Sequence, residues 1–490
     1  MPNQMTALDA TFLELEEVDE SAHMHIGGVL VFDPAPGRPG APPIDEIREG
    51  LAERLGDLPR FRHRLSRQET GGLHWPQWVP DEYFDLERHV FEAKLPAPAG
   101  EEELRAWAGE YFSERLTRSR PLWEIVSLEL ADGGWALVSK THHCMVDGVG
   151  SIDIVQTILD AEPEPGAAGN GTPRVGHPEA THPQPVPSAG GGLPMPARMV
   201  SAGAGLAFGA ARAGVGLARR AADTVMHPRE LGTLAKQAEA VTELLIKSEL
   251  VAAPATTLNE PIGPARELAV AAVPLAELKE ISHSLGGTVN DVVLAATGTA
   301  MRRLLIERGE LLPDRGIRAM VPVDIRGAAK RLELGNEITS LFVELPVESP
   351  DPLRRYAAQV DQAETLKSGS QAKGSRTLID LSGHAPPVLH SFLARALYST
   401  RLFNLTITNV PGPQIPLYAF GSRMRAIWPL VPLAAEHALG LAVFSYDGNL
   451  YFCFNGDPES VPELQWVAET TRAAIDELLA AVRSGHEDGA

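Results

Sequence analysis

The length, composition and charge of the chain exclude several classes of protein. With 490 residues, 44% of them hydrophobic and 22% charged, the sequence is that of a globular protein long enough for two domains. A net charge of −21 argues against general nucleic-acid binding, because an acidic surface repels a polyanion. The two cysteines, Cys144 and Cys453, exclude a disulfide framework.

The sequence predicts a cytoplasmic protein. So few cysteines fit a reducing compartment, and the first residues lack the basic and apolar regions of a signal peptide. No stretch approaches the ~20 uninterrupted apolar residues of a membrane-spanning helix. Peripheral contact with the inner membrane or with lipid bodies stays open.

Residues 1–161 are predicted to form an N-terminal domain in which strand and helix patterns alternate. The strands are expected at residues 25–33, 123–130 and 135–141, and the helices at residues 45–55 and 151–159. Ala131-Asp132-Gly133-Gly134 lies between the last two strands and is a hairpin signal. The second hairpin strand leads directly into His142, so a histidine motif is expected at a strand end.

A change in composition follows this domain. Residues 162–194 are rich in Pro, Gly, Ala and Thr and predict a flexible linker, because they bury too little apolar surface to offset the entropy of ordering. Residues 195–255 are expected to contain connecting helices. Within them, the Gly- and Ala-rich run 197–222 allows two interpretations: a helix packed across the domain interface, or a shallow membrane anchor.

Residues 256–490 predict a second domain of similar character. Strands are expected at residues 268–273, 317–323, 338–345 and 405–409, and helices at residues 275–285, 289–306, most of 353–398, and 461–482. A hairpin is indicated where two apolar segments flank Asp447-Gly448-Asn449. Strands and helices that interleave in both halves indicate the α/β class.

The most informative motif is His142-His143-Cys144-Met145-Val146-Asp147-Gly148. Histidine accepts and returns a proton near neutral pH, and His143 is placed where a strand ends and the chain turns. His143 is therefore the candidate general base for acyl transfer from a thioester to an alcohol, with His142 as a second candidate catalytic residue. The base would deprotonate the attacking hydroxyl and then protonate the departing thiolate, without a covalent intermediate.

Asp147 has two candidate roles in this motif. As a third catalytic residue it would accept a hydrogen bond from the imidazole. As a structural residue it would point away, pair with an arginine and fix the loop that presents His143. The sharp bend expected at Gly148 favours the structural role.

Other chemistries fit these residues less well. Adjacent histidines on an extended segment point to opposite faces, so no metal site is predicted, and no zinc-binding motif occurs elsewhere. Cys144 is expected to be a buried structural cysteine rather than a nucleophile. The chain has no GxSxG motif of a serine hydrolase, and residues 369–376 lack the correctly placed lysine of a phosphate loop.

Several short motifs follow one another in a specific order. They are Leu8-Asp9-Ala10-Thr11-Phe12-Leu13, Pro121-Leu122-Trp123-Glu124, the histidine motif, Thr288-Val289-Asn290-Asp291, Val321-Pro322-Val323-Asp324-Ile325-Arg326, Gly335-Asn336 and Asn409-Val410-Pro411-Gly412-Pro413. In this order they resemble the bacterial wax ester synthase/acyl-CoA:diacylglycerol acyltransferase family, over nearly the whole chain apart from the linker. That family is related to chloramphenicol acetyltransferase and to the condensation domains of peptide synthetases.

The resemblance implies two chloramphenicol-acetyltransferase-like sandwich domains with a shared central channel. It also implies His143 as general base, acyl-CoA as co-substrate without a further cofactor, and diacylglycerol or a long-chain alcohol as acceptor. In the wider superfamily the motif aspartate pairs with an arginine from the other half, and Arg326 is the best positional candidate for a partner of Asp147. The DFGWG element of the condensation-domain and plant relatives is missing, as is usual in the wax ester branch.

Some of these motifs also have a structural interpretation. Asn290 and Asp291 are ordinary helix-start residues behind a Thr288 cap, whereas the resemblance suggests that Asn290 hydrogen-bonds near the reacting carbonyl. The Pro-Leu-Trp motif is expected to pack at a strand start, and the two prolines of residues 409–413 to fix a turn beside the channel. The candidates for substrate binding or structural support are Gly148, Asn290, Asp291 and Arg326.

The residues that bind the coenzyme are not identified by the sequence. Residues 60–67 alternate basic and apolar side chains, as a half-exposed strand would, and a solvated strand face is the favoured interpretation. Arg302 and Arg303 are further candidates for the coenzyme phosphates.

The sequence therefore predicts an O-acyltransferase that forms triacylglycerol or wax ester. One alternative is a transferase for another hydroxyl acceptor, such as a polyketide or a peptide on a carrier protein. Another is a non-catalytic lipid-binding or lipid-droplet coat protein, against which the intact histidine motif argues.

Overall fold

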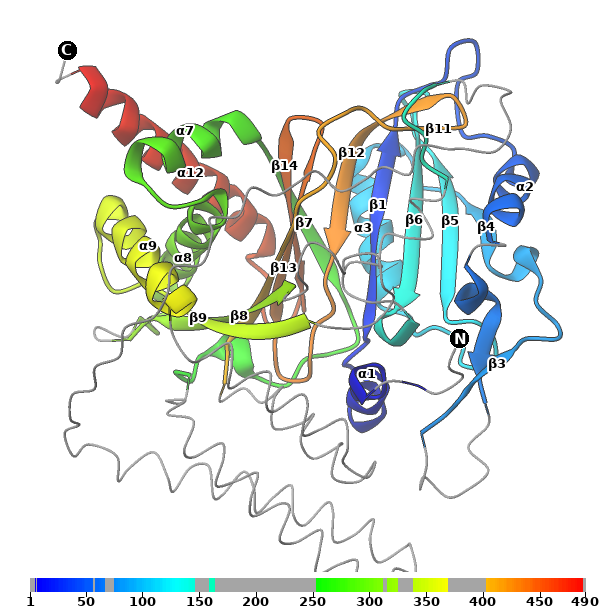
Figure 1. Ribbon diagram of the computed structural model, residues 1–490, viewed down its shortest axis with the longest axis horizontal. Coiled ribbons are helices and arrows are strands. Elements are labelled where there is room, and N and C mark those ends of the chain that lie inside the picture. Colours follow the sequence, from blue (N-terminus) through cyan, green and yellow to red (C-terminus); the bar gives the residue numbers. More distant parts are fainter. Residues whose placement is uncertain are drawn as a thin grey trace, which may run out of the picture.

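The computed structural model describes residues 5, 7–55, 58–66, 75–145, 158–163, 253–311, 315–324, 338–368 and 402–487. Most of the predicted linker and of the predicted connecting helices lies outside these residues. Within them, the chain folds into two six-stranded sheets and a small two-stranded sheet, with helices packed against them (Figure 1).

The first large sheet is built mainly from the N-terminal part of the chain. Its strand order is β11-β12-β1-β6-β5-β4. The strands are β1 (His25–Phe32), β4 (Val90–Ala93), β5 (Trp123–Glu129), β6 (Trp135–His142), β11 (Tyr418–Ala419) and β12 (Ser422–Leu430). β5 and β6 pair antiparallel with Trp123 opposite Thr141, which confirms the predicted hairpin.

The pairing of β1 with β6 requires glycine at one position. The two strands run antiparallel from His25, opposite His142, to Phe32, opposite Trp135. A Cβ on Gly27 would lie 1.8 Å from the carbonyl oxygen of Ser139, a separation that no side chain can adopt. This close pairing fixes the register that brings His25 beside His142.

The second large sheet belongs to the C-terminal half and has the order β7-β14-β13-β10-β8-β9. Its strands are β7 (Glu267–Pro274), β8 (Ile317–Asp324), β9 (Ile338–Leu345), β10 (Leu405–Val410), β13 (Leu439–Tyr446) and β14 (Asn449–Gly456). β13 and β14 form the second predicted hairpin. Asp447 and Gly448, at its turn, have φ values of 43° and 81°, as a two-residue type I′ turn requires.

Helices cover both sheets. They are α1 (Ala7–Val18), α2 (Ile44–Arg54), α3 (Glu101–Phe112), α7 (Leu275–Leu285), α8 (Val289–Glu307), α9 (Pro352–Ser368) and α12 (Leu464–Glu487). α7, α8, α9 and α12 lie together on the side of the second sheet that faces away from the first (Figure 1). Among the described helices, none combines the length and the apolar character needed to cross a membrane.

Two strands cross between the halves of the chain. β11 and β12 come from the C-terminal half but belong to the first sheet, where β12 pairs antiparallel with β1 and places Leu430 opposite Gly27. The predicted division into residues 1–161 and 256–490 did not include this exchange. The first sheet is therefore complete only when both halves of the chain are present.

The apolar cores show how closely the two sheets are joined. One core fills the N-terminal half and also takes in Phe444, Tyr446 and Tyr451 from β13 and β14. The other core lies between the second sheet and its helices. The protein is thus an α/β fold with two sheet-rich domains, as predicted, whereas the shared central channel stays a prediction.

The basic segment at residues 60–67 differs from its prediction. Pro59–Arg62 forms a 3-10 turn (η2), and only His63–Leu65 is a strand (β2), paired with β3 (Trp78–Pro80). Proline suits the start of such a turn, because its φ is already close to the helical value. The guanidinium of Arg60 lies over the ring of Trp78, 4.5 Å from its centroid, so this side chain packs against an aromatic residue.

Candidate active site

The two histidines lie where β6 ends, as the sequence predicted. His142 is the last residue of β6, and its N–H donates to the carbonyl of Leu122 at 2.9 Å. His143 opens the 3-10 turn η4 (His143–Met145), and its N–H donates to the carbonyl of Met24 at 2.8 Å. Sheet pairing therefore holds the backbone up to the point where the chain turns.

His143 is held by an aromatic neighbour from α1. Its imidazole stacks on Phe12 with 3.8 Å between ring centroids and 16° between planes. The residue is half-buried, and its Nδ1 has no hydrogen-bond partner among the described residues. Burial lowers the pKa of His143 to about 4, so the imidazole is neutral at physiological pH.

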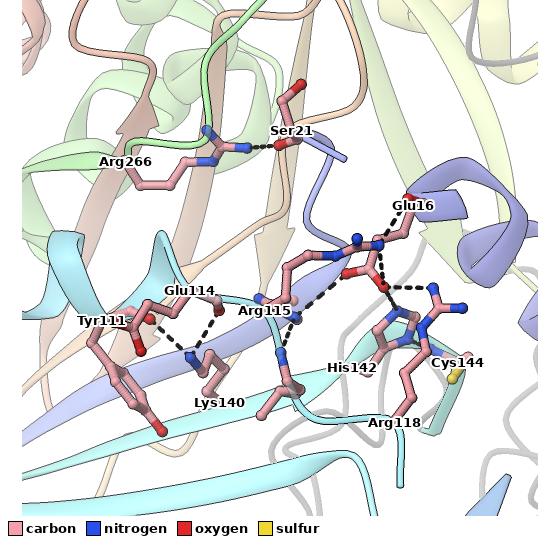
Figure 2. A network of polar contacts seen from close by, with 12 residues as sticks. Glu16, Ser21, Tyr111, Glu114, Arg115, Arg118, Lys140, His142, Cys144 and Arg266 are labelled. Atoms are coloured by element: carbon pink, nitrogen blue, oxygen red, sulfur yellow. Dashed lines mark hydrogen bonds and ion pairs between the residues drawn. The ribbon is translucent and has the colours of Figure 1, made fainter. Parts of the chain in front are cut away.

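His142 is fully buried, and a polar group lies beside each of its ring nitrogens. The backbone N–H of Cys144 donates to Nδ1 at 3.1 Å, and Nε2 lies 3.4 Å from Oε2 of Glu16 (Figure 2). A nitrogen that accepts a hydrogen bond carries no proton, so the ring proton of a neutral His142 is on Nε2. The structure thus brings the two histidines together in different environments.

Glu16 is a buried carboxylate at the centre of a group of charged and titratable side chains (Figure 2). Its carboxylate lies 2.7 Å from Arg118, 3.2 Å from Arg115 and 3.6 Å from His25, and its side chain is only 3% exposed. Burial alone would raise the pKa of Glu16, but His142, His25 and Arg118 together lower it below its ordinary value. Glu16 is therefore ionised at neutral pH.

Lys140 and Arg266 hold the segments around this group. The Lys140 ammonium donates to the carbonyls of Tyr111 and Glu114 at 2.8 and 3.0 Å, which ties the C-terminal end of α3 to β6 (Figure 2). Arg266 comes from the residues just before β7 and donates to the carbonyl of Ser21. Segments from both halves of the chain thus meet at Ser21, five residues after Glu16.

The two cysteines have structural positions. Cys144 and Cys453 are buried free thiols, and burial raises the pKa of each above its ordinary value. A thiol with a raised pKa is a poor nucleophile, which agrees with the structural role predicted for Cys144. Within the described residues, no group of His, Cys, Asp and Glu side chains is arranged to hold a metal ion.

Three predicted site residues lie outside the described residues. They are Asp147, Gly148 and Arg326. The triad and structural roles of Asp147, the bend at Gly148 and the pairing of Asp147 with Arg326 therefore stay predictions.

Asn290 and Asp291 have different roles at the start of α8. Thr288 and Asp291 form a capping box: Oδ2 of Asp291 accepts from the N–H of Thr288 at 2.8 Å, and the Asp291 side chain is buried. The helix-start interpretation is thus confirmed for Asp291. Asn290 instead accepts a hydrogen bond from Nδ2 of Asn409 at 3.2 Å, so two motifs far apart in the sequence meet here.

The Asn-Val-Pro-Gly-Pro segment packs tightly on β13. The N–H of Gly412 donates to Oγ of Ser445 at 3.0 Å, and a Cβ on Gly412 would lie 2.2 Å from the Ser445 carbonyl oxygen. Only glycine fits this approach. The predicted rigid turn is therefore anchored directly to the second sheet.

The Pro-Leu-Trp motif packs at the start of β5, as predicted. Leu122 and Trp123 are fully buried, and Nε1 of Trp123 donates to the carbonyl of Phe61 at 2.7 Å. Arg302 and Arg303, considered for the coenzyme phosphates, instead contact the protein itself: Arg302 donates to the carbonyl of Val347, and Arg303 pairs with Glu477.

Sequence reasoning missed the side chains that hold the histidines. Glu16, Arg115 and Arg118 carry no recognisable spacing, because the two arginines are about 100 residues from Glu16 along the chain. Phe12 belongs to the Leu8-Asp9-Ala10-Thr11-Phe12-Leu13 motif, which indicates the family but not a contact with His143. The only signal in the sequence was their spacing. Phe12 and Glu16 are four residues apart, which places two side chains on the same face of a helix.

Comparison with known proteins agrees with the family resemblance. Residues 5–293 match the model of the wax ester synthase/diacylglycerol acyltransferase catalytic domain, and residues 334–479 match that of the WS/DGAT C-terminal domain. The chain is 30% identical to the probable diacylglycerol O-acyltransferase tgs1 of Mycobacterium tuberculosis H37Rv over 98% of this chain and 96% of that protein.

Solved structures share the fold. The wax ester synthase/diacylglycerol acyltransferase from Marinobacter aquaeolei VT8 matches with a TM-score of 0.65 and 23% identity, over 98% of this chain and 100% of that one. The first condensation domain of the CDA synthetase matches with a TM-score of 0.58 and 17% identity, over 98% and 96%. From the family models and the full-length relatives, the chain belongs to the wax ester synthase/diacylglycerol acyltransferase family and is an O-acyltransferase.

Proposed function

We propose that the protein transfers a long-chain acyl group from acyl-CoA to diacylglycerol or a long-chain alcohol, with His143 as general base. The observation that carries this proposal is the His143 imidazole itself. It stands at the end of β6, half-buried, stacked on Phe12 and neutral at physiological pH. A neutral imidazole with a free nitrogen lone pair is the form that accepts a proton.

The reaction needs one base and no covalent enzyme intermediate. As the acceptor hydroxyl attacks the thioester carbonyl, its proton passes to His143, and a tetrahedral intermediate forms. The intermediate collapses by breaking the carbon–sulfur bond, and the imidazolium gives its proton to the departing thiolate. With a pKa of about 4, the imidazolium is a stronger acid than an ordinary histidine, which favours this second proton transfer.

The remaining members of the site are assigned from the family. Asp147 and Gly148 are expected to shape the loop after His143, with Arg326 as the partner of Asp147. Asn290, whose amide oxygen accepts a hydrogen bond from Asn409, keeps its amide N–H groups to donate toward the reacting carbonyl. Acyl-CoA enters as a co-substrate, and we expect the reaction to need no bound cofactor or metal.

Acceptor choice rests on the relatives, which are named for diacylglycerol and for wax ester synthesis. Both kinds of acceptor are dissolved in lipid rather than in water. We therefore expect peripheral contact of the protein with a membrane or with lipid bodies during turnover.

A panel of acceptors tests this function. The purified protein is given radiolabelled palmitoyl-CoA with dipalmitoylglycerol, hexadecanol or a hydroxyacyl carrier protein, and products are identified by mass spectrometry. Triacylglycerol or wax ester, together with an equal amount of free coenzyme A, is the expected result. Product only on the carrier protein would instead indicate a different acceptor class, and lipid binding without any ester would indicate a non-catalytic lipid-binding protein.

A further inference from the structure

Helix α1 contacts both histidines of the pair through one of its faces. Phe12 and Glu16 are four residues apart and therefore lie on the same side of the helix. Phe12 stacks on the ring of His143, and Oε2 of Glu16 lies 3.4 Å from Nε2 of His142. Both contacting side chains are buried. One turn of α1 thus holds the reactive ring and its neighbour.

His142 lies between a group that only donates and a group that only accepts. The N–H of Cys144 donates to Nδ1 at 3.1 Å, and Nε2 lies 3.4 Å from the ionised carboxylate of Glu16, a group that can only accept. The neutral ring with its proton on Nε2 presents an acceptor to the Cys144 N–H and a proton to the Glu16 carboxylate. A proton on Nδ1 would instead face the Cys144 N–H, and a flipped ring would direct carbon atoms at both polar partners.

The orientation of the His142 ring affects the position of His143 through backbone hydrogen bonds. Cys144, which donates to the His142 ring, directly follows His143, and the N–H of His143 is itself bound to the carbonyl of Met24. The peptide groups on both sides of His143 are therefore fixed. The ring of Phe12 then limits rotation of the imidazole.

We propose that Glu16 and Phe12 are positioning residues for acyl transfer: Glu16 fixes the tautomer and orientation of His142, and Phe12 fixes the plane of the His143 ring. This inference rests on the proposed role of His143 as general base. In this role neither side chain takes up or releases the proton of the reaction. Loss of either one lowers kcat and leaves KM nearly unchanged, because the base is displaced while substrate binding is intact.

Glu17 provides a matched control for Glu16. Both carboxylates contact Arg118, Glu16 at 2.7 Å and Glu17 at 2.8 Å. The side chain of Glu17, however, is 41% exposed, and among the described contacts it reaches neither histidine. A change of Glu17 to glutamine removes one charge beside Arg118 but leaves His142 in place.

The first test compares Glu16→Gln with Glu17→Gln in the full-length protein, using palmitoyl-CoA and hexadecanol. Glutamine keeps the size of glutamate but replaces one acceptor oxygen with a donor, and the two neighbouring arginines draw its remaining oxygen toward themselves. We expect kcat of Glu16→Gln to fall about 100-fold with KM for both substrates changed less than about twofold. Glu17→Gln should match the wild-type protein.

A second measurement, the ¹⁵N chemical shift, determines the tautomer of His142 independently of activity. In protein labelled with ¹⁵N-histidine, the Nδ1 signal of His142 should have the shift of an unprotonated nitrogen in wild type and Glu17→Gln, and should move in Glu16→Gln. Phe12→Leu supplies a variant that keeps the apolar volume and the charges: we expect the same loss of kcat with an unchanged His142 signal.

The outcomes separate this inference from the proposed function. If His143→Ala loses activity while Glu16→Gln and Phe12→Leu turn over like Glu17→Gln, the positioning role is wrong and the base assignment stands. If His143→Ala stays active, His143 is not the base, and this inference fails with that assignment whatever the other variants do. If Glu16→Gln does not fold, Phe12→Leu with wild-type kcat still overturns the inference.

Discussion

At the scale of the residue, burial decides what each histidine can do. His143 and His142 are adjacent, yet one has a half-buried ring with an unbound Nδ1 among the described residues, and the other is buried between Glu16 and the Cys144 N–H. Desolvation penalises the charged form of an imidazole, so His143 keeps its lone pair at neutral pH. The same chemical group therefore serves once as candidate base and once as a structural link.

The lowered pKa of His143 predicts an unusual pH dependence. The free enzyme's kcat/KM should stay constant from pH 8 down to about pH 5.5, because a group with a pKa of about 4 is still neutral there. Stability, unlike activity, should begin to fall at a higher pH. The unfolded chain takes up this proton near pH 6.5, so the free energy of unfolding falls as pH drops from 6.5 toward 4.

Initial rates at subsaturating substrate test this dependence, with circular dichroism at each pH to confirm that the protein stays folded. An acid limb with an apparent pKa close to 6.5 would contradict the desolvation that lowers the pKa of His143.

At the scale of the element, the sequence predicted the helices and strands that are marked by neighbouring residues in the chain, such as turn residues and apolar runs. The hairpins β5–β6 and β13–β14 carry turn residues between apolar runs, and α7 and β9 end at the residues predicted. α1, α3 and β12 were missed. The residues that decide their placement belong to distant partners: β12 pairs with β1, and Lys140 of β6 binds the end of α3. Such contacts leave no periodic signal in a single sequence.

A substitution at Gly412 tests how the Asn-Val-Pro-Gly-Pro segment is attached to β13. In Gly412→Ala the new methyl group would meet the Ser445 carbonyl at 2.2 Å and the Phe444 ring at 2.3 Å. We expect a loss of about 3 kcal/mol in the free energy of unfolding in urea. Gly298→Ala in α8 is the control, since its methyl group would lie 3.5 Å from Leu345 and alanine favours a helix by up to about 1 kcal/mol. Equal stability of the two variants would show that the segment is not anchored as described.

At the scale of the whole molecule, the two halves are not independent. β12 completes the first sheet beside β1, and side chains of β13 and β14 enter the first core. The α/β class and the presence of two sheet-rich domains followed from the order of predicted elements. The placement of β11 and β12 in the first sheet could not be predicted in this way, because the order of elements along the chain does not determine which strands become neighbours in space.

This exchange predicts the behaviour of fragments. Residues 1–161 expressed alone should be insoluble or unfolded, because β1 loses its partner and the core loses Phe444, Tyr446 and Tyr451. Coexpression with residues 253–490 should restore soluble, folded material. Solubility and thermal unfolding of each preparation provide the measurement. A cooperative unfolding transition in the isolated N-terminal fragment would refute the interdependence.

The most direct test of the central claim is turnover by His143→Ala. With palmitoyl-CoA and hexadecanol, the release of coenzyme A thiol should fall by about 100-fold or more, while the thermal unfolding temperature stays close to that of the wild-type protein. Thiol release by the folded variant at a rate near that of the wild type would contradict the assignment of His143 as the base.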